Sequence, residues 1–248
     1  MNRTYLLLLV FAATTVCATA QIRFRLAGGM STDWITSDNA ATYRLAPPDT
    51  VSPAGGGFDG AQLGWGLRGY VDLDKQKKFR VPVGLDVFYY RGAQSIASDL
   101  YSIRVQHQNT LTTALAGFEW SFIEFPWAFA RAYVGVEARM LFVNQSQIKY
   151  EETQLVNGVP QYQNVEYGGK DPATRLGGLI RFGLEGEIYY PVFINTSVGW
   201  GSMNLIGRDE RPTSDGGRGQ LLTPSSTNEG PEQLLYHVNF TFMVQVRL

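Results

Sequence analysis

The sequence has few of the residues on which most chemistry depends. Its 248 residues include one cysteine, Cys17, and two histidines, which stand far apart at 107 and 237. No Cys/His spacing of a metal site occurs, so we expect neither a metal nor a cofactor. Lys and Arg number 21 against 22 Asp and Glu. A nucleic-acid-binding protein would show a basic excess, so we expect no nucleic-acid partner.

Long apolar runs are also missing, and the longest one lies at the start of the chain. Arg3 precedes the short apolar run Tyr5–Ala13, and Ala18-Thr19-Ala20 forms a small-x-small cleavage site. This is the pattern of a secretory signal peptide. The apolar run is about half of the ~20 residues that a membrane-spanning helix needs. We therefore predict a cleaved signal at 1–20 and one mature domain at 21–248, without cysteine.

The mature sequence alternates with a period of two. Even positions from Ala130 to Phe142 are apolar, whereas Arg131, Glu137 and Arg139 occupy odd positions. Strand side chains point alternately to opposite faces, so this segment has one apolar face and one charged face. A helix would distribute the charges around all its sides. About eight such segments occur, at 22–33, 62–72, 79–90, 112–120, 130–142, 175–188, 192–200 and 236–248.

The lengths of the connections decide which face points outward. A soluble barrel would point its apolar faces inward, whereas a membrane barrel points them to lipid. Short and long connections alternate, as in an up-and-down barrel with short periplasmic turns and long extracellular loops. Aromatic residues gather near both sets of strand ends, which is typical of the two interfaces of a bilayer. The short links are 73–78, 123–127 and 190–191, and the long links are 35–59, 92–108, 144–171 and 205–233.

The polar strand faces then point into the lumen. An eight-stranded barrel has an interior just wide enough for side chains to fill. Charges of both signs occur on these faces, so we predict a lumen plugged by mutual pairing. The predicted network consists of Arg23, Arg25, Arg68, Asp72, Arg80, Asp86, Glu119, Arg131, Glu137, Arg139, Arg175, Arg181, Glu185 and Glu187.

The two ends of the mature chain carry a family resemblance. The last strand, YHVNFTFMVQVRL, has Phe240, Phe242, Val244 and Val246 at alternate positions, although Leu248 replaces the usual terminal Phe. The chain resembles the small outer-membrane β-barrel family of the OmpA/OmpX-like type. Its opening, QIRFRLAGG, is similar to barrels of the Bacteroidetes type. The resemblance implies an eight-stranded antiparallel barrel in the outer membrane of a diderm bacterium. It also implies recognition of the last strand by the barrel-assembly machinery.

One long link has a structure of its own. Asn157-Gly158 separates two β-prone runs, 147–156 and 159–167. Asn-Gly is the strongest short hairpin signal, because both residues tolerate positive φ. We predict a hairpin that continues its strands beyond the membrane. Its edge could pair with a strand of a surface or envelope protein, although it could also be an inert extension.

Catalytic chemistry has little support in the sequence. His107, Ser98, Asp99 and Ser102 fall within one expected loop, but nothing there fixes a catalytic geometry. His237 is expected to pack in the lumen. The dinucleotide-like pattern of glycines at 64, 66 and 69 lies within a strand and has no helix after it. We therefore expect no enzyme and name no catalytic residue.

The sequence is compatible with four functions. The favoured one is a non-enzymatic outer-membrane protein with a structural or surface-interaction role, surrounded by outer-membrane lipid. A narrow gated channel, a subunit of an export complex, and a soluble periplasmic ligand-binding barrel are the alternatives.

Overall fold

A computed structural model describes most of the chain after residue 22. The described residues are 23–36, 40–42, 57–74, 76, 78–168, 171–208, 221–222 and 232–248. The predicted signal at 1–20 lies outside them. Within these ranges no helix has the length and the hydropathy to cross a membrane.

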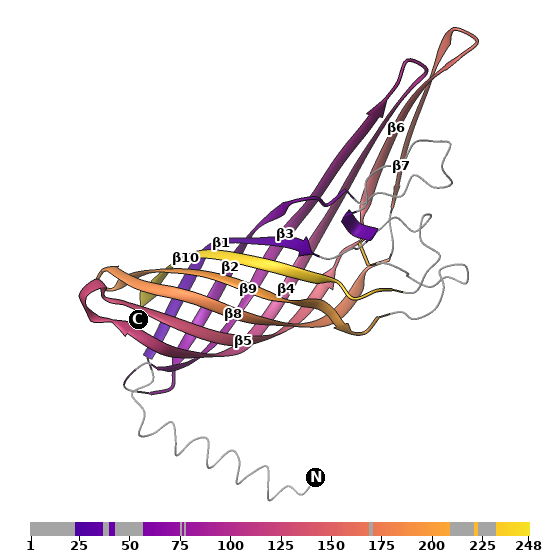
Figure 1. Cartoon of the computed structure of the whole chain (residues 1–248). Helices are drawn as coiled ribbons and strands as arrows, with labels where there is room; N and C mark the ends of the chain where they lie inside the picture. The colour runs from indigo at the N-terminus through magenta and orange to yellow at the C-terminus, as the bar shows by residue number, and fades with distance from the viewer. Residues whose placement is uncertain are drawn as a thin grey trace, which may run out of the picture.

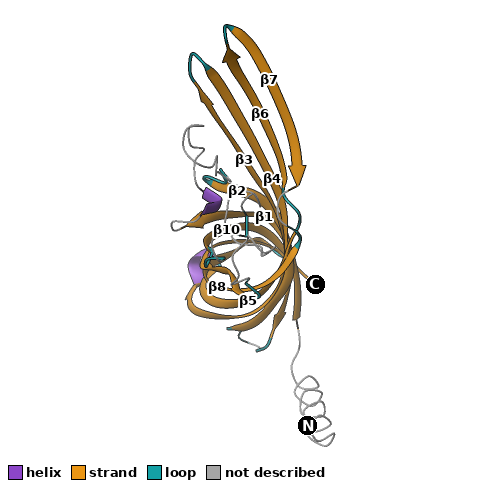
Figure 2. Cartoon of the chain, turned by 90° about the vertical axis from the view of Figure 1, so that its right-hand side faces the viewer, coloured by secondary structure: helices purple, strands orange, loops and turns teal. Residues whose placement is uncertain are grey.

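Eight of the ten described strands close into a ring. Neighbouring strands are antiparallel in the order β1-β2-β3-β4-β5-β8-β9-β10, and β10 returns to pair with β1 (Figures 1 and 2). The remaining strands, β6 and β7, form a hairpin against β4. The predicted eight-stranded antiparallel up-and-down barrel is confirmed. The strands are β1 (Arg23–Thr36), β2 (Ala61–Asp72), β3 (Phe79–Ala97), β4 (Tyr101–Phe125), β5 (Ala130–Val143), β6 (Gln147–Val156), β7 (Val159–Gly168), β8 (Ala173–Tyr189), β9 (Val192–Ile206) and β10 (Tyr236–Arg247).

The barrel is apolar outside and charged inside. Leu67 on β2 is 54% exposed, whereas its neighbour Arg68 is 1% exposed. Val136 and Glu137 on β5 repeat this contrast, and so do the other strands of the ring. Exposure of so continuous an apolar outer wall to water is energetically unfavourable, whereas contact with lipid favours such a wall. This arrangement is that of an outer-membrane-type β-barrel, and a soluble barrel, which needs the opposite orientation, is excluded.

The two ends of the ring differ in the length of their connections. At the turn end, residues 73–78, 126–129 and 190–191 join successive strands. At the loop end, β1 and β2 are separated by 37–60, and β9 and β10 by 207–235. The predicted sorting of short turns and long loops therefore holds for these connections. The prolines at 47, 48 and 53 and the charged run 209–211 lie outside the described residues.

The expected loop at 92–108 is instead a hairpin. Strand β3 continues to Ala97, and β4 begins at Tyr101, with Ile96 directly opposite Ile103. The prediction of a loop was wrong because residues 91–97 of β3 are mostly small or polar and alternate weakly. On β4, however, Ile103 and Val105 pack with Ile148 of β6 into a buried apolar cluster. Pairing between the two strands persists there because each satisfies the backbone groups of the other.

The hairpin predicted around Asn157-Gly158 is present. Asn157 has φ of 52° and Gly158 has φ of 77°, so both adopt the left-handed conformation that such a turn requires. Strand β6 pairs with the part of β4 from Tyr101 to Gln108. Together with the upper half of β3, these strands form a four-stranded sheet that rises beyond the ring (Figure 1). We call it the protruding sheet.

Candidate functional site

A cluster of six charges occupies the turn end of the lumen. Glu185 on β8 is its centre, because its carboxylate receives hydrogen bonds from the guanidinium groups of Arg25 and Arg80. Arg131 Nη2 lies 2.9 Å from Glu185 Oε1. All four side chains are buried, so each charge depends on the others rather than on water. The other two carboxylates of this turn-side cluster are Asp72 and Glu119.

A second cluster lies at mid-height and is centred on Glu137. Arg181 Nε donates to Glu137 Oε1 at 2.6 Å, and Arg139 Nη2 donates to Oε2 at 2.8 Å. Arg68 bridges Glu137, at 3.0 Å, and Asp86, at 3.1 Å. We call these five residues the central cluster. It draws on β2, β3, β5 and β8, so it ties opposite walls of the ring together.

Within each cluster the positive and negative charges almost cancel. The turn-side cluster has three arginines and three carboxylates, whereas the central cluster has three arginines and two carboxylates. The sums are therefore 0 and +1. A buried pair gains little net stability when intact, but removal of one partner costs about 3–5 kcal/mol, because a charge remains without compensation.

Three residues of the predicted network lie elsewhere. Arg23 is exposed, and Glu187 is half-buried. Arg175 pairs with Glu232 at 2.7 Å near the loop end. The sequence analysis missed Glu232 because this residue lies in a connection rather than in an alternating strand.

A third polar group lies above the central cluster. His237 Nδ1 is 2.6 Å from Asp33 Oδ1, and the Tyr90 hydroxyl donates to Asp33 Oδ2 at 2.9 Å. All three side chains are at most 1% exposed. His237 therefore packs in the lumen, where the sequence analysis had placed it.

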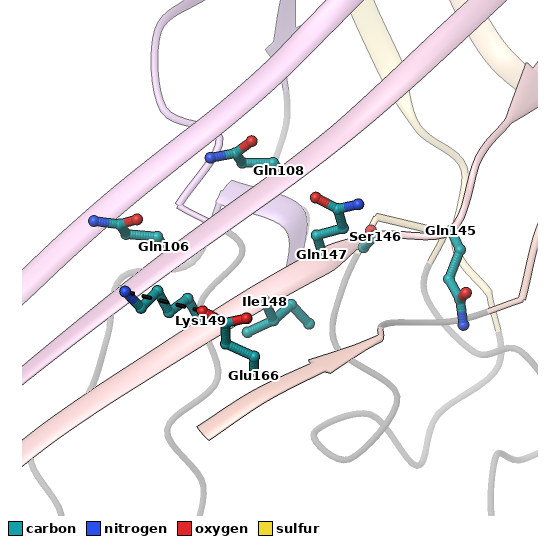
Figure 3. Close-up of a pocket in the computed structure, with 8 residues that line it drawn as sticks. All are labelled: Gln106, Gln108, Gln145, Ser146, Gln147, Ile148, Lys149 and Glu166. Atoms are coloured by element: carbon teal, nitrogen blue, oxygen red, sulfur yellow. Dashed lines mark ion pairs between the residues drawn. The ribbon is translucent and has the colours of Figure 1, made fainter. Parts of the chain in front are cut away.

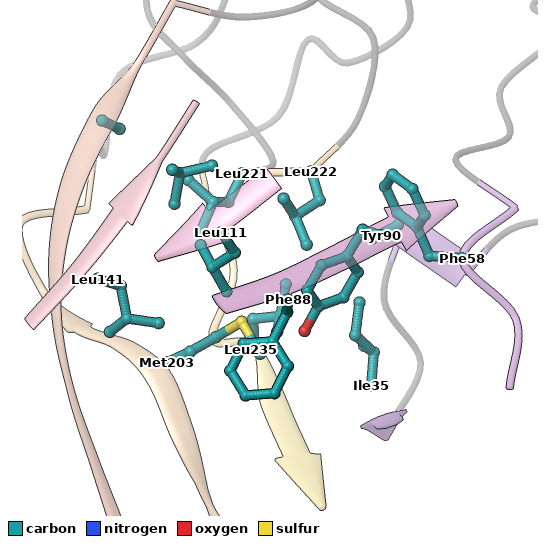
Figure 4. Close-up of a cluster of buried hydrophobic side chains, with 13 residues drawn as sticks. Ile35, Phe58, Phe88, Tyr90, Leu111, Leu141, Met203, Leu221, Leu222 and Leu235 are labelled. Atoms are coloured by element: carbon teal, nitrogen blue, oxygen red, sulfur yellow. The ribbon is translucent and has the colours of Figure 1, made fainter. Parts of the chain in front are cut away.

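A cluster of buried apolar side chains lies at the loop end of the barrel. Inward-facing residues of the strands meet residues of the long connections there (Figure 4). The sequence analysis missed this apolar cap because its loop members belong to no periodic pattern. The described members are Ile35, Ala41, Phe58, Phe88, Tyr90, Leu111, Leu141, Val143, Ala173, Met203, Leu221, Leu222 and Leu235.

The possible Ser/His/acid set does not assemble. His107 lies within β4 and is 1% exposed, with its ring 4.4 Å from the ring of Phe58. Ser102 is five residues away on the same strand, which is about 16 Å at 3.3 Å per residue. Ser98 and Asp99 lie at the tip of the β3–β4 hairpin. The expected loop position of His107 was wrong, since the chain remains extended there. No group of metal-binding side chains occurs in the described part of the chain.

The outer face of the protruding sheet is polar and hollowed at its base. A hollow of about 560 Å³ is lined by residues of β4, β6 and β7 and by the link before β6 (Figure 3). Lys149 Nζ lies 2.9 Å from Glu151 Oε1 and 3.9 Å from Glu166 Oε1. The hydrogen bond from Lys149, followed by its charge, lowers the pKa of Glu151, and the same contact raises the pKa of Lys149. The lining residues are Gln106, Gln108, Gln145, Ser146, Gln147, Ile148, Lys149 and Glu166.

The protruding sheet ends in two edges that differ. On the β3 side, Gln62 Oε1 accepts a hydrogen bond from the backbone N–H of Arg91 at 2.8 Å, so a side chain occupies one edge position. On the other side, β7 is the last strand of the sheet among the described residues. Its outer face presents Tyr162, which is 77% exposed.

Comparisons with known proteins give a likeness to small barrels. No protein-family model and no curated protein matches the chain. The chain is similar to the crystal structure of Neisserial surface protein A, with 10% identity, a TM-score of 0.42, and coverage of 91% of this chain and 97% of that chain. It is also similar to Ail, the attachment invasion locus protein of Yersinia pestis, with 9% identity, a TM-score of 0.39, and coverage of 92% of this chain and 100% of that chain. Membership of the OmpA/OmpX-like family remains a prediction, and function has to be argued from the residues.

Proposed function

We propose that this chain is a non-enzymatic surface-interaction protein of the outer membrane of a diderm bacterium. The ring crosses the bilayer, with its short turns in the periplasm and the protruding sheet outside the cell. The observation that carries the proposal is the outer edge of β7, with which no strand of the described residues pairs. An unpaired strand edge is a template for another strand, and proteins usually shield such edges.

The hairpin register indicates which backbone groups of β7 are available. In a two-residue hairpin the flanking residues form a hydrogen-bonded pair, here Val156 and Val159. Such pairs then recur at every second residue. The N–H groups of Tyr162, Asn164 and Glu166 consequently point away from β6. Pro160 occupies the remaining outward position near the tip, where its missing N–H leaves one donor fewer.

A partner strand would therefore pair with β7 through these three donors and the carbonyl groups of the same residues, which also point outward. The test is a selection of phage-displayed peptides on the folded protein, followed by binding to two variants. Asn164→Pro removes one outward N–H, whereas Asn164→Ala keeps it. We expect peptides that bind the edge to lose their binding to the Asn164→Pro variant and to keep their binding to the Asn164→Ala variant. If every selected peptide binds both variants equally, the edge is not the binding site.

The side chains inside the lumen favour the interpretation of a closed barrel over that of a pore. The two charge clusters and the apolar cap occupy it from the turn end to the loop end. A narrow gated channel is the second candidate, since a network of buried charges can rearrange. Recordings in planar bilayers distinguish the two, as set out in the Discussion.

Two further partners belong to the same proposal. The barrel-assembly machinery would recognise β10, whose outward side chains Phe240, Phe242, Val244 and Val246 are exposed. A subunit role in an export complex would use the hairpin 147–167 as its contact. Deletion of 147–167 would then abolish co-purification of the other subunits, and an unchanged set of co-purified proteins would exclude that role.

A further inference from the structure

The lipid-facing wall contains one apolar groove that the surface-interaction role does not use. It has a volume of about 500 Å³ and runs over β4, β5, β8, β9 and β10. Three phenylalanines form its rims, namely Phe122, Phe182 and Phe240, and each of them is about half-exposed. The side chains between them are smaller.

The groove has a definite structural cause. Ala132 and Thr196 point outward between the phenylalanines and fill little space. Gly183, beside them on β8, has no side chain. A Cβ at Gly183 would lie 2.3 Å from Tyr133 Cζ, so the glycine makes room for the Tyr133 ring in the lumen. That ring is fixed by a hydrogen bond of 2.7 Å from its hydroxyl to Asn195 Oδ1. The outward hollow therefore follows from the small side chains of Ala132 and Thr196, while the Tyr133 ring occupies the lumen side of the wall at Gly183.

The height of the groove indicates which leaflet it meets. Ala132 is two residues from the start of β5, and Leu184 is five residues before the end of β8. Both of these strand ends lie at the turn end of the barrel. The groove is thus continuous with the apolar band in the half of the membrane nearest the turns. The occupant has to be apolar, elongated and resident in that leaflet.

We propose that this groove is a binding site for one acyl chain of a phospholipid from the turn-side leaflet. The three aromatic rings would contact the chain from its sides, and Ala132 and Thr196 would form the floor beneath it. A lipid in the groove would exchange more slowly than lipids elsewhere around the barrel, because more of its surface is in contact with protein.

Photo-crosslinking in vesicles tests the site. The protein is reconstituted in phosphatidylethanolamine/phosphatidylglycerol vesicles that contain a small share of phosphatidylethanolamine with a diazirine in one acyl chain. After illumination, the sites of attachment are mapped by mass spectrometry. We expect attachment near 182–184 and 196–198 to exceed several-fold that near Leu67 and Val83, which face lipid on the far wall. Even labelling of both walls would overturn the proposal.

Two substitutions sharpen the experiment. Ala132→Phe fills the floor of the groove, whereas Ala138→Phe adds the same ring to an outward position of β5 outside it. We expect the excess labelling to disappear in Ala132→Phe and to persist in Ala138→Phe. Equal labelling of the two variants would contradict the site. Thr196→Phe serves in place of Ala132→Phe if the latter does not fold, as judged by its mobility on unheated gels.

Discussion

Arg181 on β8 and Glu137 on the neighbouring strand β5 meet in two parallel hydrogen bonds inside the lumen. Nε donates to Oε1 at 2.6 Å, and Nη2 donates to Oε2 at 3.1 Å. The same carboxylate also forms ion pairs with Arg68 and Arg139, so the charges of three guanidinium groups are compensated by one glutamate. A bidentate, fully buried arrangement of this kind fixes geometry as well as charge. The central cluster is therefore the part of the lumen most sensitive to substitution.

Glu137→Gln is expected to destabilise the barrel severely. Three buried arginines would be left with Asp86 as their only carboxylate in the central cluster, and loss of one partner of a buried pair costs about 3–5 kcal/mol. Urea unfolding in detergent, followed by tryptophan fluorescence, measures the change. Glu187→Gln is the matched control, because Glu187 is half-buried and forms no ion pair with the described residues. An equal loss of unfolding free energy in both variants would contradict the dependence of the barrel on the central cluster.

The hairpin 147–167 is expected to be dispensable for folding. Within the described residues β6 pairs with β4 and β7, whereas the ring closes through other strands. A variant in which a short Gly-Ser link replaces this segment should still migrate as a compact band on an unheated gel. Loss of that band would mean that the hairpin takes part in closing the barrel.

Gly158→Ala is expected to loosen the tip of the hairpin. Gly158 has φ of 77° and open space around it, so an added Cβ meets no atom but adopts an unfavourable conformation that costs about 1 kcal/mol. Hydrogen exchange of β6 and β7 should accelerate several-fold. Gly186→Ala is the control, because its Cβ would lie at an ordinary 3.7 Å from that of Ala130. An unchanged exchange rate in Gly158→Ala would contradict the assigned turn.

The Lys149–Glu151 pair is expected to give the hairpin a pH dependence. Its contact lowers the pKa of Glu151, so this stabilisation exists above the ordinary glutamate pKa and is lost as the pH falls through the lowered value. The pKa of Lys149 is raised, so its share exists below the ordinary lysine pKa and is lost at strongly alkaline pH. Both side chains are exposed, so the effect is small and is screened by salt. The protection factors of the β6 amides, which are corrected for the intrinsic pH dependence of exchange, should be lower at acid than at neutral pH in the wild type. This difference should be smaller in Glu151→Gln.

The wild-type barrel is expected to be silent in planar bilayers. This expectation follows from the proposal that the two charge clusters and the apolar cap plug the lumen. Recordings of wild type, Arg139→Ala and Glu137→Ala test this expectation. Discrete openings of the wild type would favour the gated channel, whereas silence in every folded variant would count against it.

Much of this architecture could be predicted from the sequence because a strand has a period of two. The contrast between Leu67 and Arg68, repeated along the chain, separated an apolar from a charged face, and the alternation of short and long connections assigned the apolar face to lipid. Asn157-Gly158 indicated its hairpin for an equally local reason, namely the backbone conformation that these residues tolerate.

The remainder depends on contacts that local patterns do not encode. Arg25 and Glu185 are 160 residues apart, so their pairing follows from ring closure and strand tilt. The apolar cap includes Phe58 and Leu222, which lie in connections where neither period nor length indicates an inward direction. Strand pairing across 92–108 was missed because residues 91–97 are mostly small or polar, and the apolar partner of Ile103 and Val105 is Ile148, which lies about 40 residues away on β6.

Heat-modifiability shows most directly whether the chain is a closed barrel with its apolar faces in the membrane. The outer-membrane fraction is run on SDS gels with and without boiling. A closed barrel resists cold detergent, so we expect a compact, faster band that shifts to the position of the unfolded chain on boiling. A single band at one position in both samples, with the protein released in the periplasmic fraction, would contradict the membrane barrel.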